Sequence, residues 1–155
     1  MQLRITKNSD KPHSLLYKRD NGTETWMSAG EFFVRHDLSH YAIEKTLGYT
    51  TAFMGMLNDG MDIKDFEDRD KRLRIPLTAE GVYAENMANL FLMEIVQGGV
   101  EDMNQVIADS FIAMGRPLRP VRLSDAELTA VRSLLRQLLG DWNVLPVGQT
   151  MILEF

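Results

Sequence analysis

Two of the chain's three histidines, His36 and His40, lie four residues apart in the segment 31–47. The pattern of this segment predicts a helix, in which residues four apart lie one turn apart on the same face. His36, His40 and Glu44 then fall within about 80° of one another around the helix, with Asp37 beside Glu44. Imidazole nitrogens and carboxylate oxygens are ligands that first-row divalent metals use in proteins. The spacing predicts a site for a divalent metal, and zinc suits it, with His36, His40 and Glu44 as ligands.

The surroundings of the two histidines are expected to be apolar. On a helical wheel the histidines are flanked by Phe32, Phe33, Ile43 and Leu47, so the imidazoles should project from the side that faces the core. Polar and charged groups in such a place are costly unless they are paired. A divalent cation is one partner that would satisfy them.

Two readings without a metal stay open. In the first, the histidines are core residues that hydrogen-bond to Asp37, Glu44 or backbone carbonyls, while Arg35 or Lys45 balances the acids. In the second, the same side chains perform acid–base chemistry without an ion. The remaining histidine, His13, lies on a predicted hairpin and is expected to be an exposed or cross-strand residue rather than a third ligand.

A metal at this helix would lower the pKa of a bound water, which is the chemistry of a small metal-dependent hydrolase. Asp37 is the candidate catalytic residue, because it could act as the base or orient a histidine. The alternative function is a non-catalytic binding or scaffold protein that encloses an apolar small molecule or meets a partner, with structural histidines. Such a pocket would be lined by Phe32, Phe33, Phe53, Met54, Met56, Phe91 and Met93.

The histidine helix resembles the zincin signature, in which a glutamate that acts as general base follows the first of two histidines. Here that place holds Asp37, and Thr46 stands where metzincins have a third histidine. These two differences argue against peptidase activity.

The His-Asp-x-x-His motif is also similar to that of the ubiquinone-biosynthesis zinc scaffold family. That resemblance implies a mostly helical fold and a zinc held by His36, Asp37 and His40, although the family's further glutamate would fall on Ala52. Over a longer stretch, residues 33–44 with Gly60-Met61-Asp62-Ile63 resemble a group of small uncharacterised bacterial proteins. This last likeness implies the motif and no particular activity.

Composition excludes several classes of protein. With 155 residues and no internal repeat, the chain is expected to form a single domain, 1–155. The net charge of −5 argues against a nucleic-acid partner, and the absence of cysteine excludes disulfides and thiolate ligands. The longest apolar run, 90–96, is interrupted by Glu94 and is too short to span a membrane. No signal peptide is predicted, so the protein is expected to be soluble and cytoplasmic.

Strand patterns lie near both ends of the chain. Leu3 and Ile5 alternate with polar residues, and further strands are predicted at 13–19 and 23–27. Asn21-Gly22 between the latter two is a strong hairpin signal, and a last strand pattern follows residue 149. The prediction is an α+β, mainly helical fold, in which a helical layer packs on a small antiparallel sheet formed by the N-terminal hairpin and the C-terminal strand.

Helical periodicity predicts further helices at 51–58, 79–97, 100–114 and 124–139. Ser28 and Ser124 each precede a glutamate by three residues, the spacing of a capping box, and Gly140 is expected to end the last helix. The charged segment 61–74 is predicted to be a connector or a short exposed helix, and 116–120 to be extended.

Two residues inside the predicted helices are unusual. Gly55 either weakens its helix or allows another backbone to approach closely. Glu94 lies in the apolar run 90–96, and a buried acid needs a cation, a metal or a hydrogen bond. It either points outward at the helix edge or adds a carboxylate to the histidine site.

Overall fold

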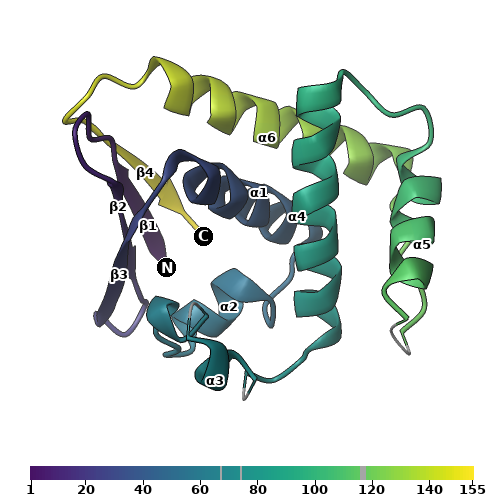
Figure 1. Ribbon diagram of the computed structural model, residues 1–155, viewed down its shortest axis with the longest axis horizontal. Helices are drawn as coiled ribbons and strands as arrows, with labels where there is room; N and C mark the ends of the chain where they lie inside the picture. The colour runs from purple at the N-terminus through teal and green to yellow at the C-terminus, as the bar shows by residue number, and fades with distance from the viewer. Residues whose placement is uncertain (67, 74, 116–117) are drawn as a thin grey trace.

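The computed structural model describes residues 1–66, 68–73, 75–115 and 118–155. It confirms the predicted α+β, mainly helical fold, with helices packed on one face of a four-stranded antiparallel sheet (Figure 1). The strands are β1 (Gln2–Thr6), β2 (His13–Lys18), β3 (Glu24–Ala29) and β4 (Thr150–Glu154). Their order is β3-β2-β1-β4, so the C-terminal strand joins the N-terminal strands in one sheet, as predicted, and its partner is β1.

The buried face of the sheet follows from the alternation of side chains along each strand. Leu3 and Ile5 of β1, and Leu15 and Tyr17 of β2, are fully buried, while their neighbours along the strands are more exposed. Leu3 lies opposite Tyr17 in the antiparallel register, which places their side chains on the same face. The helices pack on this face of the sheet.

Helix α1 (Glu31–Leu47) is the centre of the helical layer. It packs against α2 (Phe53–Asn58), α4 (Ala79–Gln97), α6 (Asp125–Val144) and strands β2 and β3 (Figure 1). Helix α5 (Met103–Ala113) packs on α4, and the short helices η1 (Ile63–Phe66) and α3 (Arg69–Arg72) follow α2. In the described ranges of the chain, no helix is both long and apolar enough to cross a membrane.

Two predicted helix-end signals are wrong, and the helices predicted at 51–58 and 100–114 are shorter, Phe53–Asn58 and Met103–Ala113. Ser28 does not cap α1, because β3 continues through it and the helix begins after Gly30, without a side-chain cap. Gly140 does not end α6. The helix continues for one more turn to Val144, and this turn carries Trp142, whose side chain is buried in the core. The capping box of Ser124 and Glu127 is confirmed. Residues 116 and 117, part of the stretch predicted to be extended, lie outside the described residues.

The apolar face predicted for α1 is correct for Ile43 but wrong for Phe32 and Phe33. These two rings are 62% and 52% exposed, because the first turn of α1 reaches solvent. The residues of α1 that face the protein interior instead include Val34, Leu38 and Ile43.

Glu94 obtains its partner from α6. Its carboxylate is 3% exposed and accepts hydrogen bonds from Arg132 Nε and Nη2 at 3.0 and 2.7 Å. The backbone N–H of Val100 donates to it at 3.2 Å. The acid inside the apolar run is therefore satisfied by a guanidinium cation, and it neither points outward nor joins the histidine site.

Gly55 lies where two backbone segments meet. A Cβ atom on Gly55 would stand 1.9 Å from the carbonyl oxygen of Thr50, a contact that no side chain can make. Helix α2 therefore packs directly on the turn that precedes it, and this contact confirms the predicted close approach of a second backbone.

We expect Gly55→Ala to lower the free energy of unfolding by about 3 kcal/mol or more, because the methyl group overlaps backbone that cannot rotate away. Gly140→Ala is the matched control. Gly140 is exposed inside α6, and a methyl group there would meet nothing within 4 Å, so this change should stabilise the protein by about 0.5–1 kcal/mol. Urea unfolding followed by circular dichroism measures both. Equal stability of the Gly55→Ala variant and the wild type would contradict the close approach.

Candidate metal centre

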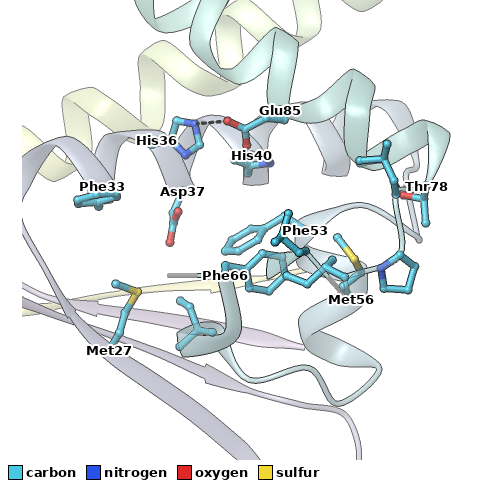
Figure 2. Close-up of a pocket in the computed structure, with 16 residues that line it drawn as sticks. Met27, Phe33, His36, Asp37, His40, Phe53, Met56, Phe66, Thr78 and Glu85 are labelled. Carbon is cyan, nitrogen blue, oxygen red and sulfur yellow. Dashed lines mark hydrogen bonds and ion pairs between the residues drawn. The ribbon is translucent and has the colours of Figure 1, made fainter. Parts of the chain in front are cut away.

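Three side chains that could bind a metal ion converge between α1 and α4. They are His36 and His40 of α1 and Glu85 of α4, and each offers one ligand atom within 4.8 Å of the other two. His40 Nε2 lies 3.1 Å from Glu85 Oε2, and His36 Nε2 lies 3.6 Å from Glu85 Oε1 (Figure 2). A tetrahedral ion with bonds of about 2.0–2.2 Å needs donor atoms about 3.3–3.6 Å apart. The two distances from the histidines to the oxygens of Glu85 are close to that spacing.

Small residues at the helix crossing allow Glu85 to reach the histidines. Ala88 is fully buried one turn after Glu85, and its carbonyl accepts a hydrogen bond from the Ser39 hydroxyl at 3.3 Å. Without bulky side chains at this point, the backbones of α1 and α4 approach closely. The two imidazole rings also lie together, with centroids 4.8 Å apart.

Glu44 is fully buried behind His40, on the far side of the ring from Glu85. Glu44 Oε1 lies 3.0 Å from His40 Nδ1, and Oε2 accepts the backbone N–H of Met54 at 2.9 Å. Both oxygens of this carboxylate are therefore engaged. In this geometry Glu44, the predicted ligand, contacts Nδ1 of His40, and Glu85 is the carboxylate that lies with the two histidines in the group that could hold a metal.

Asp37, the predicted catalytic residue, is also on α1, and its side chain is bound by a residue of the sheet. The Tyr17 hydroxyl of β2 donates a hydrogen bond to Asp37 Oδ2, and both side chains are buried. Figure 2 shows the Asp37 carboxylate pointing from α1 into the cavity beside His36. Asp37 thus lies next to the candidate metal group without belonging to it.

The ionisation of this cluster is set by its close pairs of opposite charge. Burial alone would lower the pKa of His40, but the hydrogen bonds to Glu44 and Glu85 outweigh burial and raise that pKa to about 9. The hydrogen bonds from His36 and His40 hold the pKa of Glu85 well below its usual range. Burial raises the pKa of Asp37 to about 6, against the opposing effects of Tyr17 and the histidines. Without a metal, His40 is therefore an imidazolium between two carboxylates at neutral pH.

The cluster opens onto a cavity of about 770 Å³. Its described polar lining residues are His36, Asp37, His40, Thr78 and Glu85, and the remainder of the described lining is almost entirely apolar. Of the pocket residues predicted for an apolar ligand, Phe33, Phe53 and Met56 line this cavity. The others do not: Met54 and Phe91 are in the core, Phe32 is exposed, and Met93 is not among the lining residues.

Glu85 could not be identified from sequence spacing, because it is 45 residues from His40. Helical periodicity places it in the predicted helix 79–97, but only the packing of that helix on α1 brings it to the histidines. His13 lies outside the group, as predicted: its Nδ1 accepts the backbone N–H of Asn8, and its Nε2 lies 3.2 Å from Glu31.

For the metal-free protein we expect His40 to titrate near pH 9, well above the ordinary value of about 6.5. Because the pKa is raised in the folded state, the stabilisation is fully present below about pH 6.5 and is lost as the pH rises through about 9. A nuclear magnetic resonance titration of the imidazole nitrogens in the presence of a chelator measures this pKa, with His40→Gln to assign the signal. A pKa of His40 below 7 would contradict the paired arrangement.

Comparisons of the chain with protein families, with characterised proteins and with solved structures found no match.

Proposed function

We propose that the protein binds a divalent first-row metal ion, with zinc as the first candidate, through His36, His40 and Glu85. The observation that carries this proposal is the convergence of two imidazoles and a carboxylate from two helices at one end of a cavity. Three protein ligands with a side open to a cavity are typical of catalytic metal sites, whereas structural zinc sites have four.

Glu44 supports the assignment because of the nitrogen that it contacts. A ligand histidine commonly donates its second ring N–H to a carboxylate, which fixes the tautomer and the orientation of the ring. With Nδ1–H directed at Glu44, His40 presents Nε2 to the space shared with His36 and Glu85. Glu44 is itself fixed by the N–H of Met54, so its position does not depend on the ion.

We further propose that the protein is a small metal-dependent hydrolase. A bound ion of this kind lowers the pKa of a coordinated water and so supplies a nucleophile at neutral pH. Asp37 lies beside the histidines, faces the cavity and is held by Tyr17, so its carboxylate can accept a proton within the cavity. The raised pKa of Asp37, about 6, suits a general base that works near neutral pH.

Metal binding is tested by titrating the protein, purified without a nickel column and stripped by a chelator, with zinc against a chromophoric chelator. The wild type should take up one equivalent. Removing one of three ligands in His36→Ala, His40→Ala or Glu85→Gln should weaken binding by about 100-fold or more. His13→Gln is the matched control and should bind zinc as the wild type does, since His13 lies outside the group. Equal zinc content in all four variants would overturn the assignment.

Glu44→Gln in the same titration separates a positioning role from a structural one. The amide nitrogen of Gln would donate to His40 Nδ1 and favour the tautomer that carries its proton on Nε2, which cannot bind a metal. We expect zinc affinity to fall by about 10–100-fold, while the amide oxygen still accepts the Met54 N–H. If the variant unfolds, or if its zinc affinity is unchanged, then Glu44 only stabilises the core and does not position His40 for the metal.

Hydrolase activity is tested with chromogenic esters on the zinc-loaded protein. We expect turnover that a chelator abolishes, and Asp37→Asn should reduce it by about 10²–10⁴-fold at little-changed zinc affinity. Asp109→Asn, an exposed change on α5, is the control and should leave the rate unchanged. If the protein binds zinc but shows no turnover that a chelator abolishes, the hydrolase proposal is wrong and the metal-binding proposal stands.

A further inference from the structure

The cavity is strongly divided between a polar side and an apolar side. His36, Asp37, His40 and Glu85 lie together where α1 and α4 meet, whereas Met27 of β3 and Phe66 of η1 lie across the cavity from them (Figure 2). Phe53 continues the apolar side, with its ring centroid 5.1 Å from that of His40 and 4.9 Å from that of Phe66. A ligand that matched this lining would have one polar end and an apolar body.

The rim of the cavity is apolar as well. Phe33, Leu73 and Leu77 line the cavity and are 52%, 79% and 67% exposed. Large apolar side chains that gather at a cavity mouth are more often part of a ligand site than of a bare surface. These three side chains extend the apolar lining from the interior to solvent, so they could contact a chain that enters the cavity lengthwise.

The size of the cavity sets the scale of the ligand. A volume of about 770 Å³ lies within the usual range of about 300–1,000 Å³ for small-molecule sites. It exceeds what a short polar metabolite would fill, and the apolar walls would gain nothing from contact with one. Each methylene moved from water to such walls should add a similar increment of binding free energy.

We propose that the cavity binds a single-chain aliphatic acyl compound, with its carboxyl end at the metal site and its hydrocarbon chain along Phe53, Phe66 and the rim. This assignment rests on the metal site proposed above. Without an ion, the carboxylates of Asp37 and Glu85 outnumber the imidazolium of His40 at this end of the cavity, so the polar end is acidic and a carboxylate would be repelled. A divalent cation held by His36, His40 and Glu85 would offset much of this negative charge and offer an open position that suits an oxygen ligand.

The test measures the binding of acetate, hexanoate and octanoate by calorimetry to protein loaded with one equivalent of zinc. Affinity should increase by about fourfold for each added methylene. Removing the zinc should weaken octanoate binding by at least tenfold. In the cobalt-substituted protein, octanoate should also change the visible spectrum of the ion, which reports a carboxylate entering its coordination sphere.

Rim variants show whether the chain lies in this cavity. Leu77→Ser and Phe33→Ser change exposed side chains, so both proteins should fold, and both should weaken octanoate binding severalfold at unchanged zinc and acetate affinity. Ile112→Ser on α5 is the matched control, because Ile112 is 72% exposed and does not line the cavity. It should bind octanoate as the wild type does.

The outcomes separate the two proposals. Zinc binding with equal affinities for acetate and octanoate would overturn the acyl ligand and leave the metal site intact. A chain-length effect that persists unchanged without zinc would overturn the placement of the carboxyl end at the metal. No zinc binding at all would overturn both the metal site and the ligand assignment that rests on it.

Discussion

The structure depends on how one fully buried carboxylate, that of Glu44, is satisfied. A carboxylate away from water is tolerated only with partners, and Glu44 has two, His40 Nδ1 and the Met54 N–H. The first partner fixes the ring of His40 and directs its other nitrogen at Glu85 on α4. The second fixes the start of α2, whose Phe53 forms the wall next to the ring. One desolvated acid therefore links three helices and sets the geometry of the polar end of the cavity.

A proton and a metal ion are alternative ways to balance the charges of this network. With the proton, His40 is a cation that donates to Glu44 and Glu85, and the cluster is a satisfied hydrogen-bonded chain. With an ion, the same Nε2 and the same Glu85 oxygen become ligands, while the contact between Nδ1 and Glu44 stays. The hydrogen-bonded cluster and the proposed metal site would thus be two states of one arrangement, in which an ion would compete with a proton for His40.

The sequence predicts the fold well because the fold follows from local patterns. Alternation identifies the strands, and a last strand pattern after residue 149 indicates that the C-terminal strand joins the N-terminal ones, but the pattern does not tell that β1 is its partner. The one-turn spacing of His36 and His40 is enough to place both imidazoles in the site. The third member of the candidate metal group cannot be found in this way, because Glu85 joins the histidines only through the close crossing permitted by Ser39 and Ala88.

The exposure of Phe32 and Phe33 shows a second limit of sequence patterns. A helical wheel describes which residues share a side of a helix, but it does not tell how far along the helix the neighbouring elements extend. At α1 the covering elements do not shield the first turn, so residues expected in the core lie at the surface, and Phe33 lies at the cavity mouth. Glu94 shows that the opposite also occurs: a charged residue can be buried, because its partner Arg132, 38 residues further along the chain, is supplied by another helix.

The pairing of β1 with β4 has a consequence for how the chain folds. Thr6 and Thr150 join hydroxyls across this pair although 144 residues separate them. Such distant contacts raise the contact order, and chains with high contact order fold slowly because a long loop must close before the contact forms. Until β4 arrives, one edge of β1 has unpaired backbone groups that could recruit a strand from another molecule. We therefore expect this pairing to close late in folding, and the unpaired edge of β1 to be open to other chains until it does.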